Sequence, residues 1–255
     1  MAAKATLRCY AELNDFLPRR HRQRDLIARF VPPVPVRHLI ANAGVPPAAV
    51  ELVLLNGVSV GFDARVEDGD RISIYPVFES FDVSGLLRVR GTPLRQVHFV
   101  ADAHLGRLAR YLRMLGFDTL FDNDFGDNEL ARLSREEGRI LLTRDRGLLM
   151  RRGITHACYL PQLPPREQLV WVVERLQLTG LLRPFSRCTA CNGDLVTAAV
   201  GDVVGSVPDG VLRRNKRFWR CRGCGRVYWK GSHYARMREF VARVRGGECG
   251  ILTDE

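Results

Sequence analysis

Residues 97–145 have the sequence VHFVADAHLGRLARYLRMLGFDTLFDNDFGDNELARLSREEGRILLTRD. Short apolar runs alternate here with segments whose apolar residues recur every three or four positions, as on one face of a helix. Strands that alternate with helices in this way form right-handed βαβ units and a mostly parallel sheet. The stretch therefore predicts an α/β fold, with strands at 97–101, 117–121 and 139–143 and helices at 105–115 and 129–137.

The same alternation continues further along the chain. We expect another apolar strand at 157–160 and a helix at 165–178. That helix begins with Pro165, and proline is favoured in the first turn of a helix. The predicted α/β domain thus occupies residues 97–180.

Acidic residues follow the ends of the predicted strands. Asp102 comes directly after the first apolar run, and Asp145 comes shortly after the third. Asp127 opens the helix after the second strand, with Glu129 two positions later. Ligands of open parallel sheets bind beyond the carboxyl ends of the strands. Carboxylates gathered there repel one another unless a cation neutralises them, and hard oxygen ligands suit Mg²⁺ or Mn²⁺.

Each of these carboxylates also has a purely structural interpretation. Asp127 can serve as a helix N-cap, and Asp145 can belong to an ordinary turn. Asp122 and Asp124 fit a surface loop. The residues alone leave both interpretations open.

The quoted stretch and its continuation to about residue 240 resemble the Mut-seven-C ribonuclease domains, a branch of the PIN-like nucleases. The resemblance is most specific at 102–119 and 138–148. It implies a parallel sheet, an acidic metal-binding pocket and the cleavage of RNA phosphodiester bonds. It also implies that Asp102, Asp127 and Asp145 hold the catalytic metal and that Glu129 is a fourth catalytic residue.

Four cysteines form two Cys-x-x-Cys pairs separated by 29 residues, Cys188 with Cys191 and Cys221 with Cys224. Two thiolate pairs presented from tight turns form a tetrahedral site, and four sulfur ligands favour Zn²⁺. Four thiolates leave no position open for a substrate. The spacing therefore predicts a zinc ribbon whose zinc is structural.

The positive charge is concentrated near the cysteines. The chain carries a net charge of +11, and residues 210–238 contain ten basic residues and no acidic one. Basic groups contact phosphates, and the interleaved aromatic residues can stack on unpaired bases. Alternatively, Trp219 and Trp229 form the small core of the ribbon. The predicted RNA-binding residues are Arg213, Arg214, Lys216, Arg217, Arg220, Arg226 and Lys230.

The first 80 residues have a different pattern. A strand is expected at 5–10, and a helix at 36–43 ends at a glycine. Asn-Gly at 56–57 is a strong hairpin signal between short strands, and Asp-Gly-Asp at 68–70 precedes a closing strand at 71–75. Strands and a helix in this order indicate a small α+β domain.

The segment ELVLLNGVSVGFDARVEDGDRISIYPVF at 51–78 resembles the second half of ubiquitin-like β-grasp proteins of the ThiS and MoaD kind. Carriers of sulfur in that group end in a free Gly-Gly. This chain continues through Glu79, Ser80 and Phe81 instead, without that pair. We therefore expect a docking module that contacts a protein partner, while a sulfur-transfer or adaptor role is a rival hypothesis for the whole chain.

The predicted architecture has four parts: a ubiquitin-like β-grasp domain at 1–80, a linker at 81–96, a PIN-like nuclease domain at 97–180, and a zinc ribbon with a basic C-terminal helix at 181–245. The predicted function is metal-dependent cleavage of RNA, with the ribbon assisting RNA binding. A second rival hypothesis is an RNA-binding protein without catalysis.

Composition narrows the class of protein. No run approaches the roughly 18 apolar residues of a membrane-spanning helix, so no membrane association is expected. The N-terminus lacks the apolar core of a signal peptide. Cysteines in metal-binding spacing suit a reducing compartment, and we expect a cytoplasmic protein.

Overall fold

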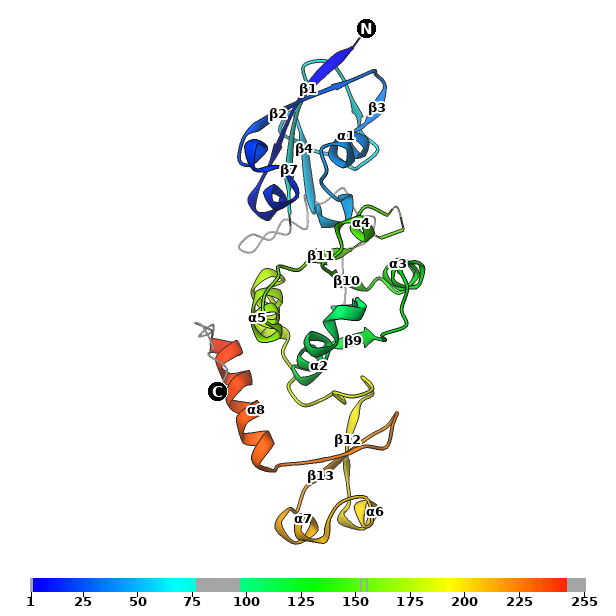
Figure 1. The fold of residues 1–255 in the computed structure, drawn as a ribbon, viewed down its shortest axis with the longest axis vertical. Helices are drawn as coiled ribbons and strands as arrows, with labels where there is room; N and C mark the ends of the chain where they lie inside the picture. The colour runs from blue at the N-terminus through cyan, green and yellow to red at the C-terminus, as the bar shows by residue number, and fades with distance from the viewer. Residues whose placement is uncertain (1, 77–96, 152, 155, 247–255) are drawn as a thin grey trace. The chain divides into compact units, whose positions relative to one another are not determined.

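The computed structural model describes residues 2–76, 97–151, 153–154 and 156–246 (Figure 1). The predicted linker at 81–96 lies outside the described residues. Two compact units make up the chain. The first contains Met1–Val97 and Gly126–Leu160, and the second contains His98–Phe125 and Pro161–Glu255.

The N-terminal part of the first unit is a five-stranded sheet in the order β2-β1-β7-β4-β5. The two central strands, β1 and β7, run parallel, and the other pairs are antiparallel. Alternate side chains of β1 are buried, which gives the sheet one core face. The strands are β1 (Ala3–Cys9), β2 (Asp25–Phe30), β4 (Leu52–Leu55), β5 (Val58–Ser59) and β7 (Arg71–Tyr75).

Helix α1 (Val36–Asn42) buries Val36, Leu39 and Ile40, and the short strands β3 (Val34–Pro35) and β6 (Arg65–Val66) pair beside it. The expected hairpin is confirmed. Asn56 and Gly57 both have positive φ, as a two-residue turn with a primed geometry requires, and β4 and β5 pair across them. Strand β2 was not expected, because its exposed and half-buried residues include two charged side chains, Asp25 and Arg29.

The rest of the first unit consists of two helices and two strands. The elements are α3 (Asp127–Glu136), β10 (Ile140–Thr143), α4 (Arg146–Leu149) and β11 (Ala157–Tyr159). Strands β10 and β11 pair in parallel. All four residues of β10 are buried, as expected of a strand covered on both faces.

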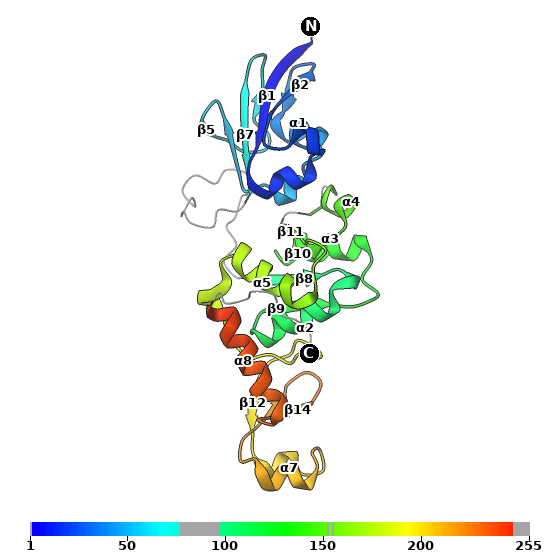
Figure 2. The ribbon, with the colours of Figure 1, turned by 60° about the vertical axis from the view of Figure 1, so that its left-hand side comes forward.

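The second unit begins with β8 (His98–Ala101), the 3-10 turn η5 (Ala103–Leu105), α2 (Gly106–Met114) and β9 (Asp118–Phe121), and β8 and β9 pair in parallel. The described strands have the sheet order β11-β10-β8-β9. Helix α5 (Pro165–Arg175) packs against α2 (Figure 2). It ends three residues earlier than predicted, because Gln177 is left-handed (φ 51°) and a 3-10 turn follows. The α/β class is confirmed.

The zinc-ribbon part of the second unit is a three-stranded antiparallel sheet of β12 (Leu195–Ala198), β13 (Phe218–Cys221) and β14 (Val227–Trp229). Two short helices that the sequence did not predict, α6 (Val200–Val203) and α7 (Asp209–Arg214), lie between β12 and β13 (Figure 1). Helix α8 (Ser232–Gly246) follows the sheet and contacts α2 and α5: the Phe240 ring lies 5.6 Å from Tyr111 and 5.4 Å from the Arg166 guanidinium. No helix among the described residues is long and apolar enough to cross a membrane.

Candidate functional site

The four cysteines of the ribbon converge on one point. Their sulfur atoms all lie within 4.8 Å of one another. Cys188 lies 3.7 Å from Cys224, and Cys191 lies 3.3 Å from Cys221. Among the described residues this is the only group of three or more potential metal ligands at such distances. The geometry expected from the spacing is therefore confirmed.

Two tight turns bring the sulfur atoms together. Gly193 must be a glycine here, because a Cβ at that position would lie 2.9 Å from the sulfur of Cys221. Gly225 follows the second pair in the left-handed region (φ 72°), which glycine adopts without strain. The backbone N–H groups of Gly223 and Cys224 point at the sulfur of Cys221. These two donors favour the thiolate form of Cys221 and oppose the effect of its burial.

Electrostatics at the cluster favours a cation. Burial raises the pKa of Cys188, but hydrogen bonds from the Tyr228 hydroxyl and from backbone amides outweigh it and lower that pKa to about 6. Burial, together with the neighbouring Cys191 thiol, raises the pKa of Cys221 to about 12. Four thiolates this close repel one another unless a cation neutralises them. The set of four sulfur donors fits Zn²⁺, which would hold the two turns together and couple metal binding to folding.

The ribbon is joined to strand β9 by buried polar side chains of the same unit. Arg113, on α2, donates from Nε to the Thr119 carbonyl (2.9 Å) and from Nη1 to the Ala190 carbonyl (2.8 Å). Asn192 accepts from the Thr119 amide (3.0 Å) and donates to Asp118 (2.8 Å). A buried polar group is stable only when its hydrogen bonds are satisfied, so these contacts fix the first cysteine turn on the β-sheet edge.

The predicted catalytic carboxylates Asp102 and Asp145 each follow a strand and precede a helix. Asp102 comes after β8 and caps η5, accepting from the Ala103 amide at 2.7 Å. Asp145 comes after β10 and caps α4, accepting from the amides of Gly147 (2.7 Å) and Leu148 (3.3 Å). Both carboxylates are therefore oriented by backbone donors at a helix N-terminus.

Asp127 and Glu129 lie in the first turn of α3. Asp127 is the first helical residue and Gly126 is the N-cap, so the interpretation of Asp127 as the cap is wrong. An ion pair joins Asp127 to Arg151 at 2.8 Å. Glu129 pairs with Arg132 at 2.6 Å, and the hydrogen bond from Arg132 lowers the pKa of Glu129. Arginines thus balance both charges in the structure.

The acidic residues are distributed over the two units. Asp102 belongs to the second unit, and Asp127, Asp145 and Glu129 belong to the first. Each unit places its own residues, and the assignment of these four as a shared metal site stays a prediction. Asp122 and Asp124 are exposed and form a local loop contact, with the Asp124 amide donating to Asp122 at 3.1 Å.

Arg146, which follows Asp145, connects α4 to the N-terminal domain within the first unit. Its guanidinium donates from Nη2 to the Asp15 carbonyl at 2.8 Å. It also lies 5.6 Å from the ring of Phe16 and 5.2 Å from the ring of Tyr159. The segment that carries Asp145 is therefore in direct contact with the domain at the N-terminus.

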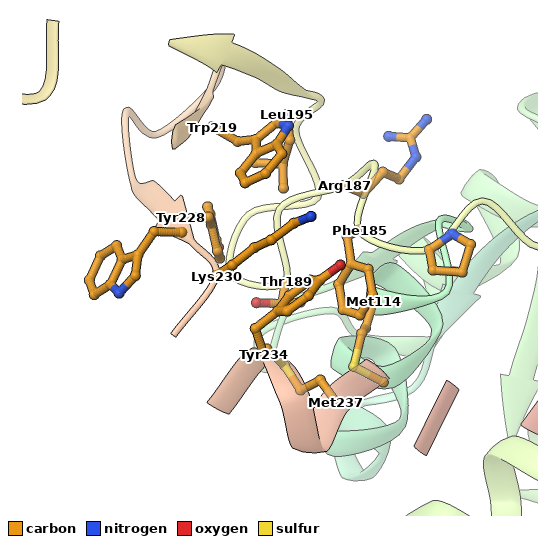
Figure 3. Close-up of a pocket in the computed structure, with 12 residues that line it drawn as sticks. Met114, Phe185, Arg187, Thr189, Leu195, Trp219, Tyr228, Lys230, Tyr234 and Met237 are labelled. Atoms are coloured by element: carbon orange, nitrogen blue, oxygen red, sulfur yellow. The ribbon is translucent and has the colours of Figure 1, made fainter. Parts of the chain in front are cut away.

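The aromatic residues of the ribbon divide between its two faces. Phe218 pairs with Trp229 across β13 and β14, and the fully buried Phe218 packs with Val203. Trp229 packs against the same core cluster. The next pair, Trp219 with Tyr228, lines a cavity that Trp229 also borders (Figure 3). The core interpretation thus holds in part for Trp229, which packs on the core cluster and reaches the cavity, while Trp219 borders the cavity.

The predicted RNA-binding residues lie on the ribbon's surface. All but one are exposed, and Arg220 is half-buried. Some make local contacts: Arg214 donates to the Gly210 carbonyl at 2.9 Å, and Arg220 donates to the Ser206 hydroxyl at 3.4 Å. Charged groups with such local partners can still contact phosphates from solvent. The exposed residues are Arg213, Arg214, Lys216, Arg217, Arg226 and Lys230.

Comparison with known families explains this combination of a parallel sheet and a cysteine ribbon. Residues 97–241 match the model of the Mut7-C RNAse domain, and residues 2–82 match the model of the Mut7-C ubiquitin domain. The first match covers more than half of the chain. The chain belongs to the Mut7-C RNAse domain family. No curated protein and no solved structure gives a significant match.

The Mut7-C match covers the sheet and the ribbon together. It extends through all four cysteines and ends within α8. This agrees with the buried contacts of Arg113 and Asn192, which sequence reasoning missed. An arginine on an amphipathic helix and an asparagine after a cysteine turn give no sequence signal for these contacts. Their backbone partners lie more than 70 positions away: Ala190 for Arg113 and Thr119 for Asn192.

Proposed function

We propose that this Mut7-C chain is a ribonuclease that cleaves RNA phosphodiester bonds with the help of Mg²⁺ or Mn²⁺. The match of residues 97–241 to the Mut7-C RNAse domain carries this proposal. The positions of Asp102 and Asp145 support it, because each follows a strand of the parallel sheet and lies where ligands of such sheets bind. In the proposal these two residues and Asp127 hold the cation, with Glu129 as a fourth catalytic carboxylate.

A divalent cation, when bound, supplies positive charge and Lewis acidity to a phosphodiester. The chain's own contribution is to present the carboxylates in fixed orientations. The backbone amides that donate to Asp102 and Asp145 restrain both side chains, so little rotational freedom is lost when a ligand binds. A cation bound by Asp127 and Glu129 would have to displace Arg151 from Asp127 and Arg132 from Glu129.

In this proposal the ribbon provides most of the affinity for RNA. Most of its exposed arginines and lysines belong to residues 210–238, which contain no acidic residue, and such a basic surface binds phosphates with strong salt dependence. The ubiquitin-like domain would dock a protein partner. Free thiols persist in a reducing compartment, so the proposal includes a cytoplasmic location.

The experiment measures cleavage of a fluorescent single-stranded RNA under saturating Mn²⁺ by the full-length protein and by Asp145→Asn. Asparagine is also a good N-cap, so α4 keeps its cap while the negative charge is lost. We expect the cleavage rate to fall about 100-fold or more, the scale reached when the support of a metal site is lost. RNA affinity should stay within about twofold.

Asp122→Asn is the matched control, because Asp122 is an exposed acid that follows strand β9 and is outside the proposed site. It should cleave at the wild-type rate. Wild-type cleavage by Asp145→Asn would refute the carboxylate mechanism. RNA binding without cleavage by the wild-type protein at any Mn²⁺ concentration would favour a non-catalytic RNA-binding protein.

A further inference from the structure

A cavity of about 270 Å³ lies between the ribbon sheet, α2 and α8 (Figure 3). It belongs to the second unit and is distinct from the carboxylates and from the cysteine cluster. Its walls are mostly aromatic and aliphatic, with two basic side chains among them. The residues that the argument uses are Phe185, Arg187, Trp219, Tyr228, Lys230 and Tyr234.

The aromatic walls face one another across Lys230. The Lys230 ammonium lies 6.0 Å from the ring of Trp219 and 5.5 Å from the ring of Tyr234, so it sits between two π-faces. Figure 3 shows the lysine extending between these two rings. The Tyr234 ring also packs against the ring of Phe185, with 4.9 Å between the ring centres. A flat aromatic ligand that displaced the lysine could stack on Trp219 or Tyr234.

The charge around the cavity selects the class of ligand. Lys230 and Arg187 line it, and the Arg187 charge is balanced by Asp118 at 3.6 Å and Asp194 at 3.7 Å. Ten basic residues with no acidic one occupy positions 210–238. A cationic ligand, such as a methylated amine, would be repelled by this surface although aromatic walls can bind one. An aromatic group linked to phosphates can stack on the aromatic walls and is attracted to the basic surface. A nucleotide has this chemistry.

The size of the cavity limits the ligand to one such group. Pockets for drug-sized ligands measure about 300–1,000 Å³, and this cavity of about 270 Å³ lies just below that range. A single base with its sugar is of suitable size, whereas a base pair of a duplex is too large and offers no exposed π-face. The cavity therefore suits an unpaired base.

The walls are fixed before any ligand arrives. Tyr228 reaches the zinc cluster, with its hydroxyl 3.0 Å from the sulfur of Cys188. Arg187 donates to the Asn192 carbonyl at 2.8 Å and lies 3.6 Å from Asp118. Rigid walls reduce the entropy lost on binding and so raise affinity.

We infer that this cavity binds one unpaired RNA base, stacked on Trp219 or Tyr234, while Lys230 contacts a flanking phosphate. The inference rests on the proposed function, which it deepens by assigning single-stranded RNA as the substrate class. It gives the ribbon a base-binding site in addition to its basic surface. The ribbon would then retain single strands and discriminate against duplexes.

The test compares the affinity of full-length protein for two probes, a single-stranded RNA of about ten nucleotides and the same RNA with abasic positions. Binding is measured without Mn²⁺, so it does not depend on cleavage. The wild-type protein should prefer the base-bearing RNA by about tenfold, within the range for loss of one stacked base. Tyr234→Leu should lose most of this preference, and Tyr234→Phe, which keeps the ring, should retain it.

Trp219→Leu and Trp219→Phe repeat the same comparison at the opposite wall of the cavity. The zinc content of every variant is measured to check that its ribbon is folded. If both leucine variants with normal zinc content keep the wild-type preference for base-bearing RNA, the base site is wrong. If the wild-type protein binds the two probes equally, the inference is also wrong. The proposed function fails separately, through normal cleavage by Asp145→Asn.

Discussion

The thiolates of the ribbon and the carboxylates of the α/β sheet differ in what holds them in place. The four cysteines come from two turns of one unit and lie within 4.8 Å of one another. The carboxylates of Asp102 and Asp145 are each held by the amides of their own helix, and Asp127 pairs with an arginine. A cation at the cysteines would thus be part of the folded structure, whereas a cation at the carboxylates would have to be recruited for the reaction.

This difference suggests a division of roles. A closed site of four sulfur ligands contributes to folding and offers no open position for chemistry. Carboxylates that are stable without a cation can gain and release one as substrate binds and leaves. The ribbon would accordingly support structure and RNA binding, and the sheet would support cleavage.

The largest expected effect comes from removing a thiolate. Cys221→Ser should abolish zinc binding and unfold the ribbon, because a structural zinc contributes on the order of 10 kcal/mol of folding free energy. Elemental analysis should find about one zinc ion per wild-type chain and none in the variant. Cys158→Ala is the control: Cys158 is a buried thiol on β11, outside the cluster, and its loss should leave zinc in place. Full zinc content in Cys221→Ser would contradict the assignment.

A smaller effect is expected at the link between sheet and ribbon. Arg113→Leu leaves the carbonyls of Thr119 and Ala190 without their donor, and each unsatisfied buried group costs about 1–3 kcal/mol. The free energy of unfolding, measured with denaturant, should fall accordingly, and zinc should dissociate faster. The exposed neighbour Arg110 provides the control, since Arg110→Leu should change stability by less than about 0.5 kcal/mol. Equal stability of the two variants would mean that the ribbon does not depend on this link.

The smallest expected effect is on the pKa of Glu129, in the first turn of α3. The hydrogen bond from Arg132 lowers the pKa of Glu129 in the folded protein. The stabilisation from a lowered carboxyl pKa is present above the unfolded pKa and is lost as the pH falls through the folded pKa. Arg132→Gln should therefore raise the pKa of Glu129 toward its ordinary value and flatten this part of the acid dependence of stability. Titration of the Glu129 carboxyl by NMR measures it, and an unchanged pKa would rule out the ion pair.

The sequence predicted those features that depend on local patterns. The hairpin at Asn56 and Gly57 needs only two residues that accept positive φ, and the cysteine cluster needs only two tight turns of fixed spacing. Periodicity located the four strands of the α/β sheet and helices α2, α3 and α5 to within a few residues, but not the short helix α4. These signals are short-range, so a single sequence carries them.

Other features depend on tertiary packing that a single sequence does not reveal. Trp219 and Trp229 both border the cavity, and only the register of β13 and β14, which pairs Trp229 with Phe218, shows that Trp229 also packs against the core cluster. Gly126 replaces Asp127 as the cap of α3, because the chain enters the helix one residue earlier than its acidic residues suggest. The arrangement of carboxylates around a shared cation depends on contacts across the whole sheet, which residue spacing does not specify.

The central claim is that the ribbon binds RNA and the carboxylates of the sheet cleave it. It is tested most directly by measuring RNA affinity and single-turnover cleavage on the same two variants. Asp102→Asn should lose cleavage while its RNA affinity stays near that of the wild-type protein. Arg214→Glu combined with Arg217→Glu should weaken RNA binding and flatten its salt dependence, yet cleave at the wild-type rate once RNA is saturating. If the ribbon variant loses cleavage at saturation, or if Asp102→Asn cleaves normally under saturating Mn²⁺, the account is contradicted.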